Sequence, residues 1–219
     1  MPKIHAHPFP RFYPILDVSL LRARGVELAD FASALRQAGV EWLQYRNKQG
    51  SEAEILQDAA ALRNIFSDTP VRLILNDYAT LLARTGFDGV HVGQGDLVPD
   101  AARAQTGHSA ILGVSTHTPE QAQAAEASDC DYIACGPVFA TATKKNPDPV
   151  IGLEGVRSIR RITGKPLVAI GGITRANCRS VLDAGADAVA VISDLLPAPG
   201  SMAAAQKIAE EFLALLRAE

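Results

Sequence analysis

Residues 135–152, CGPVFATATKKNPDPVIG, include residue types that could bind an anion. This segment follows an apolar run with the length of a buried strand and precedes a helix-like pattern, so it is predicted to be a long strand-to-helix loop. Two hydroxyls, Thr141 and Thr143, and two ammonium groups, Lys144 and Lys145, occur within it. Long loops in compact domains are commonly functional, and hydroxyls with lysines suit a phosphate or diphosphate. A solvated surface loop with a chance lysine pair is the alternative.

Gln44, Arg46 and Lys48 alternate along a short apolar run, whereas Leu43 and Tyr45 alternate with them. Because successive strand residues point to opposite faces, the three polar side chains are predicted to share one face. An amide, a guanidinium and an ammonium group would then lie together. A solvent-facing strip on an antiparallel strand is the alternative, which a parallel sheet with two covered faces disfavours.

Asn76-Asp77 and Gln94-Gly95-Asp96 each follow an apolar run. If the two runs are neighbouring strands, the two carboxylates and two carboxamides lie on adjacent loops and form a hard-oxygen site suited to Mg²⁺. Asp and Asn are also common helix N-caps, and for either aspartate alone the cap is the better interpretation. For both together, near Arg46 and Lys48, we predict a metal site formed by Asp77 and Asp96.

Two further positions have weaker signals. Gly171-Gly172 and Ile192-Ser193 follow the last two apolar runs, where backbone amides and a short helix often bind phosphate, although a glycine pair is also an ordinary tight turn. His117 could act as a general base because imidazole titrates near neutrality. A capping or hydrogen-bonded role is favoured for it, since Thr118-Pro119 begins a helix signal.

Apolar runs and helical spacing alternate along the whole chain, and no hairpin signal separates the runs. The predicted strands are Phe12–Asp17, Trp42–Arg46, Leu73–Asn76, Gly89–Val92, Ile111–Ser115, Tyr132–Cys135, Leu167–Gly171 and Ala188–Ser193. The predicted helices are Leu28–Ala38, Glu52–Ile65, Tyr78–Arg84, Asp100–Ala104, Pro119–Ala127, Leu153–Ile162, Arg175–Ala184 and Ala203–Arg217. Gly39, Gly86 and Gly185 are expected to end three of these helices in a left-handed conformation.

Eight strand-helix units in 219 residues predict a single (β/α)8 TIM barrel over residues 12–219, with residues 1–11 as a mobile tail. An open doubly wound sheet is the competing fold, but no dinucleotide-binding glycine motif follows the first strand. In a barrel the carboxyl ends of the strands form the active-site face, which would bring the residues above together.

Composition excludes several classes of protein. The net charge of −3 (21 basic minus 24 acidic) is too even for a nucleic-acid or membrane-surface protein, and no apolar run approaches the length of a membrane span. The first residues lack the apolar core of a secretory signal, so a cytoplasmic location is expected. Cys130, Cys135 and Cys178 show no zinc spacing and are predicted to be reduced, mostly buried thiols. The sequence does not fix the oligomeric state, and a homo-oligomer is compatible with it.

The motifs occur in an order and spacing that resemble the thiamine phosphate synthase / thiazole tautomerase family. They are Gln44-x-Arg46-x-Lys48, Asn76-Asp77, Gly89-Val-His-Val-Gly-Gln-x-Asp96, Gly113-Val-Ser115, Gly136-Pro-Val-Phe-x-Thr141-x-Thr143-Lys144, Ala169-Ile-Gly-Gly-Ile173 and Val189-Ala-Val-Ile-Ser193. Each motif alone is weak, and their combination in register is specific. Ala140, where the family often has proline, and Asp194, where it commonly has a small residue, depart from the pattern.

The resemblance implies an enzyme that joins an aminopyrimidine methyl diphosphate to a thiazole phosphate, giving thiamine phosphate and diphosphate. Its implied ligands for the pyrimidine diphosphate are Gln44, Tyr45, Arg46, Asn47, Lys48, Asn76, Ser115 and Lys144, of which Arg46, Lys48, Ser115 and Lys144 would be catalytic. Its implied ligands for the thiazole phosphate are Thr141, Thr143, Gly171, Gly172, Ile192 and Ser193. Asp77 and Asp96 would hold Mg²⁺ as the cofactor.

The implied chemistry needs no protein nucleophile, because the thiazole nitrogen attacks the carbon that diphosphate leaves. The leaving oxygens gain negative charge, which Mg²⁺ and the cations Arg46, Lys48 and Lys144 could stabilise. The related thiazole tautomerase is the main alternative, since that branch uses a histidine near the position of His117. A non-catalytic sensor of a phosphate ligand is a third hypothesis, which the apparent metal site disfavours.

Overall fold

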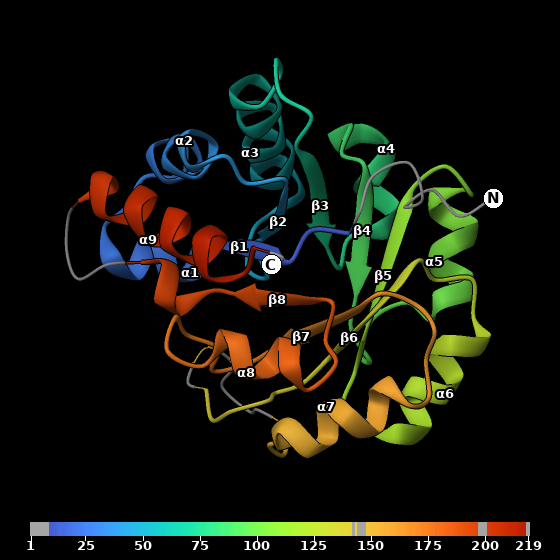
Figure 1. Cartoon of the computed structure of the whole chain (residues 1–219). Helices are drawn as coiled ribbons and strands as arrows, with labels where there is room; N and C mark the ends of the chain where they lie inside the picture. The colour runs from blue at the N-terminus through green and yellow to red at the C-terminus, as the bar shows by residue number, and fades with distance from the viewer. Residues whose placement is uncertain (1–8, 142, 144–147, 197–200, 218–219) are drawn as a thin grey trace.

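The computed structural model describes residues 9–141, 143, 148–196 and 201–217. Within these residues, eight parallel strands form a closed barrel in which each strand pairs with the next and β8 pairs with β1 (Figure 1). The strands are β1 (Phe12–Asp17), β2 (Trp42–Arg46), β3 (Arg72–Asn76), β4 (Gly89–Val92), β5 (Ile111–Thr116), β6 (Tyr132–Cys135), β7 (Leu167–Ile170) and β8 (Ala188–Val191). The predicted TIM barrel is therefore confirmed.

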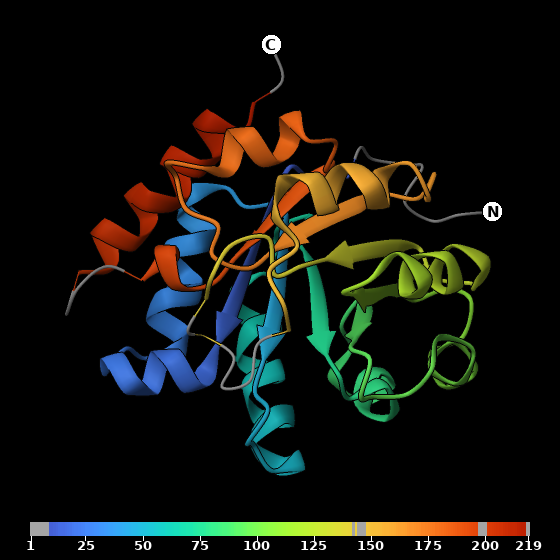
Figure 2. The same ribbon diagram turned by 90° about the horizontal axis from the view of Figure 1, so that it is seen from below.

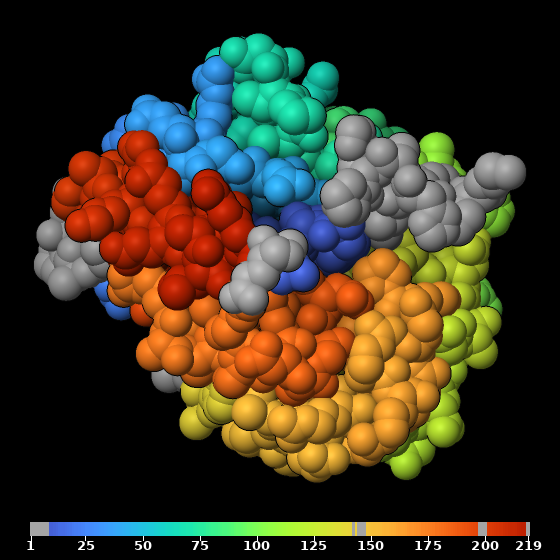
Figure 3. Space-filling view, in the orientation of Figure 1, coloured from blue at the N-terminus to red at the C-terminus, as the bar shows by residue number. Residues whose placement is uncertain are grey.

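Helices surround the barrel and cover the outer face of the sheet (Figures 1 and 3). They are α1 (Val18–Arg24), α2 (Leu28–Ala38), α3 (Glu52–Ile65), the 3₁₀ turn η2 (Ala79–Leu81), α4 (Leu82–Thr85), α5 (Pro99–Thr106), α6 (Pro119–Ala127), α7 (Gly152–Arg160), α8 (Cys178–Asp183), the 3₁₀ turn η3 (Ser193–Leu195) and α9 (Met202–Leu215). The last helix packs beside α2, so the two ends of the helical layer meet and the ring closes (Figure 3).

The strands agree with the sequence prediction to within two residues, whereas one helix was missed. The segment after β1 was left without structure up to Leu28, but it forms α1. The Asp17 side chain accepts a hydrogen bond from Leu20 N and caps this helix, and Gly25 ends it in a left-handed conformation. Gly39, Gly86 and Gly185 have the positive φ values that were predicted.

Strand alternation divides the apolar side chains into two cores. Side chains on one face of the strands, such as Leu43 and Tyr45, pack outward against the helices. Those on the other face fill the barrel interior, and they include Tyr13, Trp42 and Tyr132. Because the interior is filled, the barrel is a packed scaffold and not a pore.

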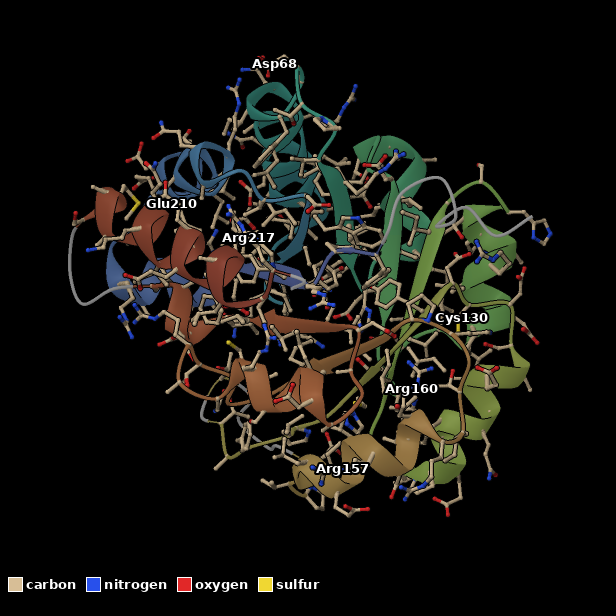
Figure 4. The ribbon with its side chains drawn as sticks, in the orientation of Figure 1. Asp68, Cys130, Arg157, Arg160, Glu210 and Arg217 are labelled. Atoms are coloured by element: carbon tan, nitrogen blue, oxygen red, sulfur yellow. The ribbon has the colours of Figure 1, made fainter. Side chains whose placement is uncertain are left out.

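Aspartates that precede β4, β6 and β8 join neighbouring strands at the amino-terminal end of the barrel. Their carboxylates accept backbone hydrogen bonds from the preceding strand: Asp88 from Leu73 N (2.9 Å), Asp131 from Leu112 N (2.7 Å) and Asp187 from Leu167 N (2.8 Å). Each also pairs with an arginine: Arg72 with Asp88 (2.7 Å), Arg103 with Asp131 (2.8 Å) and Arg160 with Asp187 (2.8 Å). Figure 4 shows Arg160 projecting from α7, and Arg160 also donates to the carbonyl oxygens of two residues in the α7–β7 loop.

The segment predicted as a tail is only partly described. Phe9 packs against Trp42 and Tyr132, with ring centroids 4.8 and 5.4 Å apart, and Pro10 is buried. Phe9 therefore packs on the interior core of the barrel, which differs from the predicted mobile tail, and residues 1–8 lie outside the described part.

All three cysteines are buried and unpaired, as predicted. Burial raises the pKa of Cys135 to about 12, so it is a packing residue without thiolate character. None of the described helices has the length and apolarity needed to cross a bilayer.

Candidate active site

A cavity of about 600 Å³ opens at the carboxyl ends of the strands. Figure 2 shows the strand arrowheads on the same side of the barrel as the described parts of the β6–α7 connection. Most of the predicted site residues line this cavity: Gln44, Arg46, Lys48, Asn76, Asp77, Asp96, Ser115, Thr141, Thr143, Gly171, Gly172, Ile192 and Ser193. Residues far apart in the sequence thus meet because parallel strands end on one rim.

Arg46 is held at the rim by a buried carboxylate. Asp17 and Arg46 are partners in the β1–β2 register, and their side chains form an ion pair. The Asp17 side chain is only 3% exposed and its other oxygen caps α1, so it has one fixed orientation. This restricts the Arg46 guanidinium, which reaches the cavity.

Asp77, Asp96 and Lys48 form a charged cluster on the β2–β4 side of the cavity. Lys48 Nζ lies 3.0 Å from Asp77 Oδ2. Burial, followed by the proximity of Asp96, raises the pKa of Asp77, and the Lys48 ammonium opposes this shift. Asp77 has a left-handed backbone (φ 70°), and its N–H donates to the His91 carbonyl (2.8 Å), so the carboxylate is held in an uncommon conformation.

The donor set fits a divalent cation. Asp96 Oδ2 accepts from Gly93 N (2.8 Å), which orients the second carboxylate beside the first. Burial and the neighbouring Asp96 disfavour a charged Asp77 and raise its pKa, and a bound cation would stabilise the charged carboxylate. The described residues contain no cluster of three acidic, histidine or cysteine ligands, so a cation bound here would complete its shell with water or substrate phosphate, as Mg²⁺ commonly does.

Asn76 presents an unsatisfied donor beside this cluster. The side chain is 6% exposed, and its Nδ2 has no hydrogen-bond partner among the described residues. Buried polar groups are normally paired. Since Asn76 lines the cavity, this amide is suited to donate to a ligand.

The opposite wall is built from the ends of β6, β7 and β8. Gly171 and Gly172 have φ values of 101° and 64°, and a Cβ on Gly172 would lie 2.5 Å from the Ala140 carbonyl oxygen. Phe139 N donates to Gly171 O (2.9 Å), so the β6–α7 loop lies directly on the glycine turn. The glycines are therefore required for the loop that brings Thr141 and Thr143 to the cavity.

Asp194 does not face the candidate phosphate site. Its carboxylate accepts from Arg175 N (3.0 Å) and pairs with Arg175 Nε (3.2 Å), and it does not line the cavity. Ser193 does line it. The departure from the family pattern at Asp194 is thus compensated by Arg175, and the Asp194 carboxylate is kept out of the cavity lining.

His91 lies beneath Ser115 in the barrel interior. Its Nε2 is 2.8 Å from Ser115 Oγ and its Nδ1 is 2.9 Å from the Tyr132 hydroxyl. Burial lowers the pKa of His91 to about 4, so the ring is neutral at physiological pH. A neutral imidazole has one donor and one acceptor nitrogen. The nitrogen that faces Ser115 therefore connects this residue by a hydrogen bond to the barrel interior.

His117 also lines the cavity, but it is already bonded on both sides. Its Nδ1 donates to the Gly136 carbonyl (2.5 Å), and its Nε2 lies 3.3 Å from Asp148 Oδ2. Together these two interactions connect the end of β5 to both ends of the β6–α7 connection. This geometry agrees with the hydrogen-bonded role that the sequence favoured.

Three predicted ligands are not brought to the cavity by described side chains. Tyr45 points outward, packs on Phe87 and donates to Asp58 Oδ2 (2.6 Å), because it alternates with Gln44 and Arg46 along β2. Asn47 is buried and its side chain packs against Gly50, away from the cavity lining. For these two side chains the structure differs from the prediction. Lys144 lies outside the described residues.

Sequence reasoning missed Asp17, Tyr13 and Tyr132 as parts of the site. Asp17 ends the first predicted strand and Arg46 ends the second. Their matching positions on adjacent strands are the sequence signal that could have predicted the ion pair. The tyrosines are ordinary barrel-core residues by sequence pattern. Their hydroxyls become relevant only once the barrel register is known.

Comparisons with known proteins agree with the motif resemblance. A family model described as thiamine monophosphate synthase matches residues 12–195. A thiamine-phosphate synthase of Koribacter versatilis (strain Ellin345) is 52% identical over 209 residues, which cover 94% of this chain and 96% of the relative. A second, from Chloroflexus aurantiacus, is 39% identical over 90% of both chains. The solved structure of a thiamine phosphate pyrophosphorylase from Pyrococcus furiosus has 30% identity and a TM-score of 0.80, covering 94% of this chain and 95% of that one.

Proposed function

Because this chain belongs to the thiamine monophosphate synthase family, we propose that it joins an aminopyrimidine methyl diphosphate to a thiazole phosphate, or its carboxylated form, giving thiamine phosphate and diphosphate. It is thus a transferase of thiamine biosynthesis. The observation that carries the proposal is one cavity with two walls of different polar residues, each suited to an anion. Cations and carboxylates line the β2–β4 side, whereas hydroxyls and a glycine turn line the β6–β8 side.

The cationic wall suits the diphosphate. Arg46 offers a planar, fixed guanidinium and Lys48 a mobile point charge, so together they can follow the charge that grows on the leaving oxygens. Asn76 Nδ2 and the Ser115 hydroxyl add neutral donors on the same side. Arg46 and Ser115 are held by Asp17 and His91 before the substrate arrives, which reduces the reorganisation that the reaction requires.

Asp77 and Asp96 would hold Mg²⁺, which supplies Lewis-acid stabilisation of the leaving diphosphate when bound. The support for this part of the proposal is the adjacent carboxylate pair and the raised pKa of Asp77. Lys48 pairs with Asp77 and is therefore placed to contact the same phosphate oxygens.

The second wall suits the thiazole phosphate. The Thr141 and Thr143 hydroxyls lie 3.3 Å apart, and the turn at Gly172 and Ser193 follow β7 and β8. Apolar side chains, among them Ile15 and Ile170, line the cavity between the two walls. Holding the thiazole nitrogen in line and excluding water from the electron-poor methylene are the remaining tasks of the site.

The alternative, thiazole tautomerase, gains no support. The two curated relatives reported above carry the name thiamine-phosphate synthase. His117, which would move the proton in that reaction, is already engaged with Gly136 and Asp148. We also propose a cytoplasmic location and no role in nucleic-acid binding, and the oligomeric state stays open.

The test is a coupling assay with purified protein, the pyrimidine diphosphate and the thiazole phosphate, with and without Mg²⁺. We expect thiamine phosphate to form only with the metal. Folded protein that turns over neither substrate would contradict the proposal. A tautomerase assay on the same preparation would then show whether the chain isomerises a thiazole instead.

Asp17→Asn tests whether the buried carboxylate positions Arg46. Asparagine keeps an oxygen for Leu20 N, so the α1 cap should persist, whereas the free energy of unfolding should fall because the buried ion pair with Arg46 is lost. We expect kcat/KM for the pyrimidine diphosphate to fall by roughly tenfold, because the charge-assisted bond that orients the guanidinium is lost. Steady-state kinetics with Asp30→Asn, an exposed residue in the first turn of α2, is the control. Equal kinetics for both variants would show that Asp17 only caps the helix.

A further inference from the structure

A continuous chain of hydrogen bonds runs through the barrel interior between two cavity-lining residues, Gln44 and Ser115. Gln44 Nε2 donates to the Tyr13 hydroxyl (3.1 Å), which lies 3.0 Å from the Tyr132 hydroxyl. Tyr132 lies 2.9 Å from His91 Nδ1, and His91 Nε2 lies 2.8 Å from Ser115 Oγ. The chain therefore joins β1, β2, β4, β5 and β6.

The barrel is shaped to hold this chain. Tyr13, Tyr132 and His91 are 1%, 0% and 7% exposed, and Tyr13 and His91 also line the cavity. Tyr132 lies over Gly113, where a Cβ would be 2.0 Å from its ring. The rings of His91 and Tyr132 stack with centroids 5.5 Å apart. Among the described residues, no further side-chain hydrogen bond is made by the Tyr13 hydroxyl, the Tyr132 hydroxyl or the His91 ring.

A chain of this kind has only two arrangements of its protons. Each phenol and the neutral imidazole carries one proton that can be donated. If the hydrogen bonds do not all run in the same direction, one pair of neighbouring groups has two protons between them or none. With the Gln44 amide nitrogen against Tyr13, each proton points toward Ser115. His91 then carries its proton on Nε2, and the Ser115 hydroxyl, which accepts from it, has its own proton free for the cavity. In the reverse arrangement Ser115 donates to His91 and offers only lone pairs.

We propose that His91 is a positioning residue in its Nε2–H form, and that the chain from Gln44 makes Ser115 a hydrogen-bond donor to the substrate's diphosphate. The inference rests on the proposed function for the identity of the acceptor. The substrate's diphosphate is largely deprotonated at neutral pH and offers mainly acceptor oxygens, so the first arrangement matches it. The same arrangement leaves Gln44 Oε1 as an acceptor, which matches the amino group of the pyrimidine. The interior chain thus couples the hydrogen-bond character of two ligand-facing groups on different strands.

The direct test is the ¹⁵N chemical shifts of the His91 ring in ligand-free protein, which separate a protonated from an unprotonated nitrogen. We expect the proton on Nε2, and no change of tautomer when inorganic diphosphate is added. Tyr132→Phe keeps the ring over Gly113 but removes the bond to Nδ1, so the Nδ1 signal should shift and the tautomer should become mixed. Tyr13→Phe should change the Nδ1 chemical shift less, because the hydrogen bond between Tyr132 and His91 remains.

Kinetics provide a second readout. We expect Tyr132→Phe to lower kcat by roughly tenfold with little change in KM for the thiazole phosphate, since one donor to the leaving group becomes misdirected. Thr85→Val, which removes a buried hydroxyl far from the cavity, should change stability only. A wild-type His91 protonated on Nδ1, or on both nitrogens, would overturn the inference even if the coupling assay succeeds. Absence of coupling activity with the expected tautomer would instead contradict the proposed function.

Discussion

Replacing Asp96 with asparagine should lower Mg²⁺-dependent kcat/KM by roughly 10³-fold, equivalent to about 4 kcal/mol of transition-state charge stabilisation. The carboxylate is exposed at the rim, and its Oδ2 accepts from Gly93 N (2.8 Å). Asparagine retains an oxygen for that bond, so the turn should persist. The loss would therefore report on charge at the metal site rather than on folding.

The measurement is initial rate against Mg²⁺ concentration, with metal binding followed separately by calorimetry. Asp100→Asn is the matched control, because Asp100 is also exposed and lies in the first turn of α5, four residues away. We expect its metal dependence to equal that of the unmodified protein. If Asp96→Asn retained both turnover and metal affinity, Asp96 would not be a metal ligand. Asp77 would then be the single carboxylate left in the proposed metal site.

The fold was predictable because two independent patterns agree along the chain. Apolar runs such as Leu73–Asn76 alternate with helical spacing, and glycines such as Gly39 mark helix ends. The helix α1 was missed because it begins directly at the strand end, where Asp17 is both the last strand residue and the cap. A single residue with two roles gives no separate signal for each.

The candidate site was predictable only in part. Rim residues such as Lys48 and Asp96 follow strands, so the barrel topology brings them together. Side-chain direction along a strand excludes Tyr45, and strict use of alternation would have removed it from the prediction. The interior chain depends on pairing register, which places Tyr132 opposite Gly113. Register between non-local strands is not readable from local pattern, so His91 could not be interpreted from the sequence.

At the other end of the barrel, Arg103→Met should lower the free energy of unfolding by about 3 kcal/mol. The Arg103 side chain is 6% exposed and pairs with Asp131, which is 9% exposed. Its guanidinium also donates to the carbonyls of Asp129, Gly107 and Ala110, with distances between 2.7 and 3.1 Å. Methionine fills similar space but leaves a buried carboxylate and these carbonyls without their donor.

Urea unfolding monitored by circular dichroism measures this loss, and the slope m should stay constant if only native interactions change. Arg84→Met is the control, because Arg84 and its partner Glu52 are both 56% exposed and such pairs contribute about 1 kcal/mol or less. Activity per folded molecule should be unchanged in both variants, since neither arginine lines the cavity. Equal stability of the two variants would mean that water or backbone movement replaces the Arg103 contacts. It would also contradict the idea that the aspartates before β4, β6 and β8 stabilise the barrel through their arginine partners.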